Sequence, residues 1–443
     1  MSDLPLLDAL RAYCAADRSR FHMPGHSGRA EALSPLSAIL AFDATEIPGL
    51  DSLYEASGPI RCSEENMGEI YGCPVLYSVG GSTLAIQTML YLVLNGKNKI
   101  LCGRNAHKSA LNAIALLGAE PVWLYGDGSA GQSLFGRITP ESVEEALSLH
   151  GDAGAVYLTS PDYYGVVSDI RGISRVCHSH GVPLLVDAAH GAHFRFLPED
   201  MHPVALGADM AACSLHKTMP ALTGSALLCC RRGEDAAAAK HVMALFGSTS
   251  PSYLILASID LCGSWMKHYA RDAFSKLILR VSDLKRLAAE KGLLAPSGSC
   301  DPVRLAFGTA PLGLAGTRAA EIFRECGVEP EYADRGWVVL IPTPFHTEED
   351  LFRVEQALFA LPRSGLSLTW EAAPPMEQAV PYAEAFRLPF EVVKTEEAAG
   401  RITAESVCTC PPGVPVVVYG EQISESMAQF LRNYGIRRIK VLK

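Results

Sequence analysis

The stretch 208–228, ADMAACSLHKTMPALTGSALL, holds a lysine in a setting where lysines are uncommon. An apolar run ends at Ser214, His216 and Lys217 follow, and a turn with Thr, Pro and Gly leads into a second apolar run, 226–230. Two such runs predict buried strands, and a buried ammonium is costly unless it is paired or used chemically. Burial lowers the pKa of a lysine, so its free amine can form a Schiff base with a carbonyl. The alternative is a lysine on an ordinary exposed turn.

A phosphate-binding turn is predicted at Gly80-Gly81-Ser82-Thr83, where the strand-like run 75–79 gives way to an apolar helix. Free N–H groups and two hydroxyls at a helix N-terminus can bind a phosphate, and glycines allow the backbone to approach it closely. The alternative is an ordinary helix cap.

Asp187 closes the predicted strand 183–187 and is followed by Ala-Ala-His-Gly-Ala-His. A carboxylate there can keep a pyridine nitrogen protonated, which makes the ring an electron sink. The alternatives are a cap of the next turn or a metal ligand beside His190 and His193. A metal would require a third ligand that the sequence does not clearly supply.

His107 begins the predicted helix 107–118, where its flat ring could stack on an aromatic cofactor; the alternative is a helix-start residue without a special role. A phosphate turn, a stacking ring, an acid and a lysine follow one another as Ser82, His107, Asp187 and Lys217. This order is that of the aspartate-aminotransferase architecture, so the joint pattern predicts a pyridoxal-phosphate site without a metal.

An alternation of strands and helices from 75 to 187 is predicted to position these residues. The strands are continuous apolar runs, which predicts a parallel sheet covered on both faces. Ligands then gather beyond the carboxyl ends of the strands. The predicted elements are strands at 75–79, 99–102, 121–125, 155–160 and 183–187, with helices after Gly81, at 107–118 and at 169–180.

The rest of the chain predicts further α/β structure. Residues 21–59 are rich in Gly, Pro, His and Asp without periodicity and predict an ordered arm or loop. Residues 251–291 are mostly helical in pattern. A second α/β unit follows, with strands at 303–307 and 337–342 and helices at 317–326 and 346–361, then a linker at 363–375. The last block ends with a strand-like VPVVVYG, a helix and IRRIKVL.

Composition excludes several classes of protein. A chain of 443 residues is longer than one hydrophobic core usually organises, so more than one domain is expected. A content of 49% hydrophobic and 19% charged residues is typical of a compact globular protein. A net charge of −10 without a basic stripe argues against nucleic acid. The sequence shows neither an apolar run of roughly 18 residues nor a signal pattern at its start, so we expect a cytoplasmic protein. The 13 cysteines are scattered without a C-x-x-C pair, which favours reduced, mostly buried thiols.

The chain resembles the bacterial Orn/Lys/Arg decarboxylases, in particular the shorter members without an N-terminal receiver-like domain. The motifs that carry the resemblance span nearly the whole chain: HMPGHSGR (22–29), TEIPGLDSL (45–53), RNAHKS (104–109), LTSPDYYGVVSDI (158–170), VDAAHGAH (186–193), SLHKTMPALTGSALL (214–228), EEAAGRI (396–402) and CPPGVPVVVYGE (410–421).

The resemblance implies an α/β, aspartate-aminotransferase-like fold (pyridoxal-phosphate fold type I), with a large, mainly parallel seven-stranded sheet domain and smaller C-terminal α/β domains. The implied domains are an arm at 1–60, a large cofactor-binding domain at 61–295, a small α/β domain at 296–365 and a C-terminal domain at 366–443. It also implies a homodimer, or an assembly of dimers, with active sites at the interface.

Residue roles follow from the same resemblance. Ser82, Thr83 and Ser214 would bind the cofactor phosphate, and His107 would stack on the ring. Asp187 would pair with the ring nitrogen, which His190 flanks, while Lys217 would carry the cofactor and His216 would transfer a proton. A basic substrate side chain also requires a carboxylate, for which the candidates are Asp51, Glu55 and Glu421.

The implied reaction is decarboxylation of arginine, lysine or ornithine to an amine and CO2, in polyamine biosynthesis or acid resistance. Alternatives are an aminotransferase or lyase on the same cofactor, and a catalytically silent protein that binds it. Four departures from the family bear on this choice. The family commonly has Lys at Ser27, Thr at Asp162, an acid or serine at Ala188 and Gln at Gly224.

Overall fold

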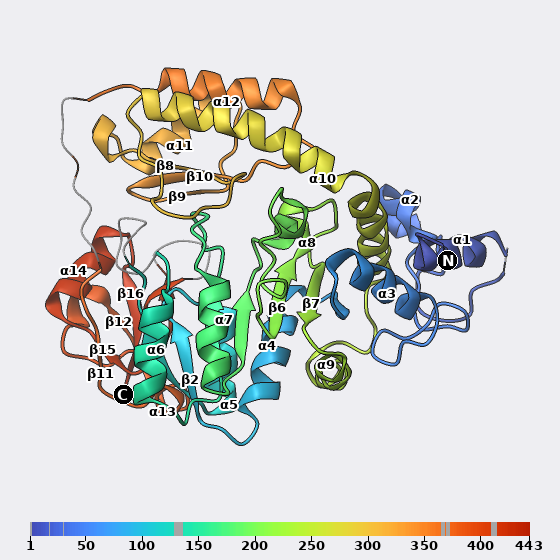
Figure 1. Cartoon of the computed structure of the whole chain (residues 1–443), viewed down its shortest axis with the longest axis horizontal. Helices are drawn as coiled ribbons and strands as arrows, with labels where there is room; N and C mark the ends of the chain where they lie inside the picture. The colour runs from blue at the N-terminus through green and yellow to red at the C-terminus, as the bar shows by residue number, and fades with distance from the viewer. Residues whose placement is uncertain are drawn as a thin grey trace. The chain divides into compact units, whose positions relative to one another are not determined.

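The computed structural model describes residues 2–16, 18–29, 31–127, 136–364, 368, 373–408 and 414–443. The chain divides into two compact units, one of Met1–Leu92 with Ala188–Phe274 and the other of Val93–Asp187 with Ser275–Lys443. Figure 1 shows their elements. Most of the predicted linker at 363–375 and the first residues of the motif 410–421 lie outside the described residues. The four predicted domains stay a prediction.

The first unit packs helices around three strands. Strand β7 runs antiparallel to both β1 and β6, with Val75 opposite Cys229 and Met210 opposite Cys230. The predicted arm contains two short helices, and 251–291 forms one 38-residue helix. The elements are α1 Pro5–Ala15, η1 Glu31–Leu36, α2 Ser37–Leu40, α3 Pro59–Tyr71, β1 Val75–Ser78, α4 Gly81–Leu94, η2 Ala192–Phe196, β6 Met210–Ser214, α8 Leu215–Thr218, β7 Ala226–Cys230, α9 Gly233–Phe246 and α10 Tyr253–Glu290. The ends of two of these helices, from Val93 in α4 and from Ser275 in α10, belong to the second unit.

The second unit begins with the predicted alternation of strands and helices. Strand β2 is parallel to β3 and β4, and β4 is parallel to β5. Helix α5 ends at Gly118, whose φ of +73° favours glycine, and α6 begins with a capping box at Thr139. The elements are β2 Lys99–Gly103, α5 Lys108–Leu117, β3 Glu120–Leu124, α6 Pro140–Leu149, β4 Val156–Thr159, α7 Ile170–Ser179 and β5 Leu184–Asp187.

The strands β1 to β7 form a seven-stranded sheet in the order β1-β7-β6-β5-β4-β2-β3. Most of its strand residues are buried, as the continuous apolar runs predicted, whereas β3 has only Leu124 buried. Because β1 and β6 both oppose β7, they point in the same direction. Their carboxyl ends therefore lie at one edge, as do those of the parallel strands β2, β4 and β5. The predicted mainly parallel, seven-stranded sheet is confirmed.

The C-terminal part of the second unit contains a three-stranded antiparallel sheet, β8-β10-β9, with α11 and α12 over one face (Figure 1). Its elements are β8 Leu305–Gly308, η3 Ala310–Leu312, α11 Gly316–Glu325, β9 Tyr332–Ala333, β10 Trp337–Leu340 and α12 Glu348–Ala360. Three two-stranded sheets with two short helices and α14 complete it: β11 Glu377–Gln378, α13 Tyr382–Ala385, β12 Phe390–Lys394, η4 Thr395–Glu397, β13 Val407–Cys408, β14 Pro415–Val417, β15 Glu421–Gln422, α14 Glu425–Asn433 and β16 Arg438–Leu442.

Within the described ranges, none of the helices has the combined length and hydropathy that a membrane span requires.

Candidate functional site

Lys217 lies in the single helical turn α8, directly after the buried strand β6. A turn then returns the chain into β7, whose residues are all buried. The two buried runs predicted around this lysine are therefore confirmed as strands. Lys217 is partly buried at the carboxyl end of β6.

The amine of Lys217 contacts an imidazole, because Nζ lies 3.0 Å from Nε2 of His190. His190 is buried and lies in the segment between β5 and η2. A hydrogen bond between the two nitrogens reduces the cost of burying the amine. The nearby ring of His193 has a different neighbour and stacks on Phe274, with 5.3 Å between the ring centres.

The predicted phosphate turn joins three segments of the first unit. Ser214 at the end of β6 donates a hydrogen bond to Ser82 in the first turn of α4, with 3.0 Å between the hydroxyl oxygens. The N–H of Gly81 donates to the carbonyl of Gly224 at 2.8 Å. Thr83 lies in the same turn with an exposed side chain. Two hydroxyls thus meet at the N-terminus of a 14-residue helix, which is a favourable place for an anion.

Asp187 ends β5 as a buried carboxylate, 3% exposed. The hydroxyl of Tyr157 on β4 donates to Oδ2 of Asp187 at 3.2 Å. Burial, with the charge of Asp187 second, raises the pKa of Tyr157 well above its ordinary value, so the phenol keeps its proton. Sequence analysis missed this residue, although Tyr157 pairs with Leu185 and therefore shares a sheet face with Asp187.

His107 caps helix α5. Its Nδ1 accepts a hydrogen bond from the N–H of Ser109 and lies 2.8 Å from the Ser109 hydroxyl. This contact fixes the plane of a half-buried ring beyond the carboxyl end of β2. A helix cap and a stacking ring are compatible, because the cap uses the edge of the imidazole and stacking uses a face.

His216 follows Leu215 in α8, and its Nδ1 lies 3.1 Å from the carbonyl oxygen of Ser225. Burial lowers the pKa of His216; the Ser225 carbonyl opposes this effect and the charge of Lys217 adds to it. The imidazole is therefore mainly neutral at neutral pH. In that state Nδ1 donates its proton to Ser225, and Nε2 carries the lone pair.

Two of the three predicted substrate carboxylates have structural partners. Asp51 accepts the N–H groups of Ser57, Gly58 and Ile60 at 2.7–3.1 Å and thereby caps α3. Burial alone would raise the pKa of Asp51, but these backbone donors outweigh it and lower the pKa.

Glu421 is 2% exposed and pairs with Arg104, whose Nη2 lies 3.3 Å from both carboxylate oxygens. Glu55 is exposed and lines a cavity of about 1010 Å³ between α3 and α9. In the part of the chain that the structure describes, no hydrogen bond or ion pair joins Asp51, Glu55 or Glu421 to Lys217, and their substrate role stays a prediction.

The departures from the family pattern occupy constrained positions. Gly224 has a φ of +97°, and a Cβ there would lie 3.2 Å from Ile255. Ser27 also has a positive φ, of 51°. Ala188 is fully buried. Asp162 is buried and accepts the N–H groups of Tyr164 and Val166, while burial raises its pKa to about 6.

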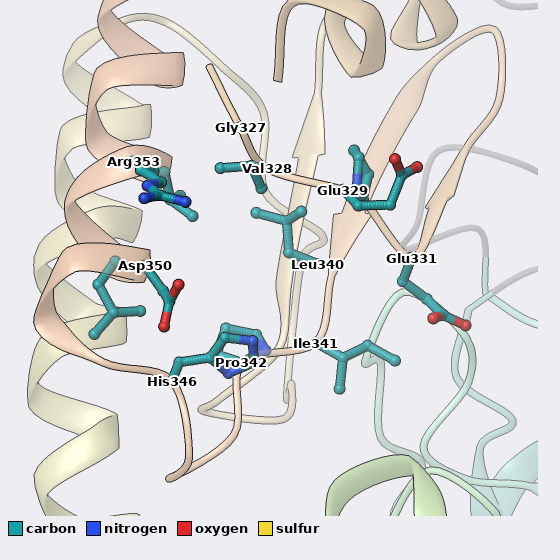
Figure 2. Close-up of a pocket in the computed structure, with 13 residues that line it drawn as sticks. Gly327, Val328, Glu329, Glu331, Leu340, Ile341, Pro342, His346, Asp350 and Arg353 are labelled. Atoms are coloured by element: carbon teal, nitrogen blue, oxygen red, sulfur yellow. The ribbon is translucent and has the colours of Figure 1, made fainter. Parts of the chain in front are cut away.

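A separate pocket of about 420 Å³ lies between α12, the end of β10 and the segment 327–331 that precedes β9 (Figure 2). His346, Asp350 and Arg353 come from the α12 side, and Glu329 and Glu331 come from the segment before β9 (Figure 2). Its described lining includes none of the predicted site residues.

Known proteins resemble the chain along most of its length. Sequence profiles of the Orn/Lys/Arg decarboxylase major domain and C-terminal domain match residues 4–306 and 367–436. An arginine decarboxylase of Halalkalibacterium halodurans is 32% identical over 460 residues, which cover 97% of this chain and 92% of that protein. An arginine decarboxylase of Bacillus subtilis is 30% identical over 456 residues, which cover 97% of this chain and 93% of that protein.

Among solved structures, the lysine decarboxylase LdcF of Francisella novicida has a TM-score of 0.83 at 18% identity, with 99% of this chain and 81% of that chain covered. This likeness confirms the predicted aspartate-aminotransferase-like α/β fold.

Proposed function

The chain belongs to the Orn/Lys/Arg decarboxylase family, and from this membership we propose that it removes the α-carboxylate of a basic L-amino acid with pyridoxal 5′-phosphate as cofactor. The observation that carries the proposal is the contact between Lys217 and His190 at the carboxyl end of a buried strand. A partly buried amine held beside an imidazole nitrogen is suited to covalent attachment of a carbonyl compound.

The donor groups fit this cofactor. Ser82, Thr83 and Ser214 would bind its phosphate at the N-terminus of α4, where the helix dipole favours a negative charge. Lys217 would hold the aldehyde carbon through its amine. When bound, pyridoxal phosphate supplies a ring that takes up the electron pair released as carbon dioxide leaves.

Asp187 and His107 would hold the ring itself. The Asp187 carboxylate is buried and accepts a hydrogen bond from the neutral phenol of Tyr157, which fixes its orientation and supports its charge. It would keep a proton on the ring nitrogen. The imidazole of His107, fixed by its cap to Ser109, would lie against one face of the ring.

His216 would move a proton at the substrate α-carbon. Because its Nδ1 proton is donated to the Ser225 carbonyl, Nε2 is the atom that accepts a proton and returns it. His190 would keep the Lys217 amine in position during turnover, while the substrate takes its place on the cofactor.

A product assay with arginine, lysine and ornithine tests the proposal. We expect the wild type to release CO2 and the matching amine from one or more of them, and Lys217→Ala to lose at least about a thousandfold in rate. The exposed Lys97→Ala variant should keep the wild-type rate. A keto acid in place of the amine would identify an aminotransferase. Bound cofactor without turnover would identify a silent binding protein, and absence of cofactor binding would refute the assignment altogether.

We further propose a homodimer in a reducing, cytoplasmic compartment. Phe21 is 99% exposed and Met23 64% exposed, and a partner subunit would cover such apolar side chains. The cysteines that the structure describes are all free thiols, which supports a reducing environment. Light scattering should give a dimer mass for the wild type, and Phe21→Ser should shift the population toward the monomer. A monomeric wild type would refute the dimer.

A further inference from the structure

Three cysteines and a histidine come together in the first unit, away from the residues assigned above. Cys213 is on β6, Cys229 is on β7, Cys73 lies between α3 and β1, and His202 precedes β6. We call these four residues the thiol cluster. They are widely spaced in the sequence and meet because three strands pair.

The strand register explains the meeting of two of the thiols. Ala211 lies opposite Cys229, and Cys213 is two residues further along β6. Side chains two residues apart on a strand share a face, so Cys213 and Cys229 point to the same side of the sheet. Ser214, the next residue, points to the other side, where the phosphate turn lies.

The distances suit a metal ion. The ligand atoms of His202, Cys213 and Cys229 all lie within 4.8 Å of one another, and Nε2 of His202 is 3.6 Å from the Cys213 sulfur. Cys73 is not in this group of three, but its thiol interacts with that of Cys229, which lowers the pKa of Cys73. Zinc bonds of about 2.3 Å to sulfur and about 2.0 Å to nitrogen hold tetrahedral ligand atoms roughly 3.5–3.8 Å apart.

Ordinary packing accounts poorly for His202. Its side chain is fully buried, and its Nδ1 has no hydrogen-bond partner among the residues that the structure describes. Its Nε2 lies within hydrogen-bonding distance of the Cys213 sulfur, which is a weak partner. A buried imidazole whose Nε2 has only this weak partner is costly, and a metal bond to Nε2 would replace it with a strong one. The ring of Tyr71 packs edge-on against His202 at 5.1 Å and closes the cluster on that side.

We propose that the thiol cluster is a structural zinc site, in which Cys73, Cys213 and Cys229 as thiolates and His202 through Nε2 complete a closed Cys₃His coordination. Binding of Zn²⁺ releases the three thiol protons to solvent. The site has no open position for substrate. It would instead fix β6 to β7 and to the segment before β1, and so hold the strand that leads to Lys217.

A route to the cluster exists on one side. Cys73 is partly exposed and lines the cavity of about 1010 Å³ between α3 and α9. Glu65 and Glu69 also line this cavity, and their carboxylates would attract a divalent cation. Cys73 would therefore be the last ligand to close on the ion.

Metal analysis of the full-length, cofactor-loaded protein tests the proposal. We expect about one zinc per wild-type chain after gel filtration, and less than about one tenth in Cys213→Ser and Cys229→Ser. The matched control is Cys230→Ser, because Cys230 is equally buried on the same strand but points to the opposite face. This control should retain the zinc.

A second measurement does not depend on how well the variants fold. Wild-type protein stripped of zinc and loaded with Co²⁺ should show thiolate-to-cobalt charge transfer and tetrahedral d–d bands, and Zn²⁺ should abolish both. A wild-type chain without zinc whose cobalt spectrum lacks thiolate bands would overturn the proposal. Retention of zinc in folded Cys213→Ser and Cys229→Ser would overturn it as well.

Discussion

Lys217 Nζ and His190 Nε2 lie 3.0 Å apart, although 27 residues separate them in the sequence. The contact gives the amine a fixed acceptor at the end of β6. His190→Ala removes the acceptor and leaves the amine free to adopt other rotamers, so we expect the decarboxylation rate to fall by roughly a hundredfold. His241→Ala, at an exposed position on α9, is the control. Equal rates for the two variants would contradict a role for His190.

Tyr157 is predicted to support cofactor binding through Asp187. Tyr157→Phe deletes the hydroxyl and leaves Oδ2 of a buried carboxylate without this donor, at a cost of about 1.5–3 kcal/mol. We expect weaker binding of pyridoxal phosphate, measured by titration of the apoprotein, with a lower melting temperature. Tyr91→Phe, which changes a ring packed edge-on against Phe246, should alter neither. Unchanged cofactor affinity in Tyr157→Phe would contradict the prediction.

Variants of the Arg104–Glu421 pair can show whether Glu421 stabilises the fold or binds the substrate. Both side chains are about 3% exposed, and Arg104 also donates to the carbonyls of Pro415 and Val416. Arg104→Met leaves a buried carboxylate unpaired, so we expect a loss of about 3–5 kcal/mol in the free energy of unfolding.

Glu421→Gln keeps the shape and part of the hydrogen bonding of Glu421, and it should cost less stability than Arg104→Met. If Glu421 served only this pair, the KM for the basic substrate would stay unchanged in any Glu421→Gln protein that folds. A rise in KM without a change in kcat would instead assign Glu421 to the substrate side chain.

The strands were predictable because a strand that is buried on both faces appears in the sequence as a continuous apolar run. β1 was expected at 75–79 and ends at Ser78, and α10 differs from its prediction by about one turn at most. Helix α3 was missed because its cap, Asp51, lies eight residues before Pro59, and local capping rules consider only the adjacent residue. Helix α6 was missed although Thr139 and Pro140 are an ordinary helix start.

Site residues that lie in short sequence motifs were predictable, whereas contacts that depend on the register between strands were not. Ser82 and Ser214 were singled out separately, and the structure joins them. The contact of Tyr157 with Asp187 could be predicted only from the pairing of β4 with β5, which the sequence does not give. The thiol cluster needed the pairing of β6 with β7, because Cys213 and Cys229 show no metal-binding spacing in the sequence.

Asp162 gives a pH dependence with a definite sign. Burial raises its pKa to about 6 from 3.8, so between these pH values the folded protein binds more protons than the unfolded chain. The contribution of Asp162 to stability is present below about pH 4 and is lost as pH rises through 6, at a cost on the order of 3 kcal/mol.

Asp162→Asn keeps an acceptor for Tyr164 and Val166 but does not ionise. Relative to wild type, the variant should become more stable as pH rises from about 4 to 7, as measured by denaturant unfolding. Stability curves that run parallel over this range would contradict the prediction.

The backbone conformation of Gly224 supports the phosphate turn. Its φ of +97° disfavours any side chain, and its carbonyl accepts the N–H of Gly81, which begins α4 beside Ser82. A Cβ would also press on Ile255 at 3.2 Å. We therefore expect Gly224→Ala to cost about 1–2 kcal/mol in unfolding free energy and to weaken binding of pyridoxal phosphate, because the turn that presents Ser82 shifts.

The control for this variant is Gly233→Ala, since a Cβ at Gly233 meets nothing within 4 Å and its φ is not positive. Denaturant unfolding and cofactor titration of the two variants should differ in both readouts. Gly224→Ala with stability and affinity equal to those of Gly233→Ala would show that the phosphate turn does not depend on this backbone conformation. A loss of stability without a loss of affinity would confine Gly224 to a folding role.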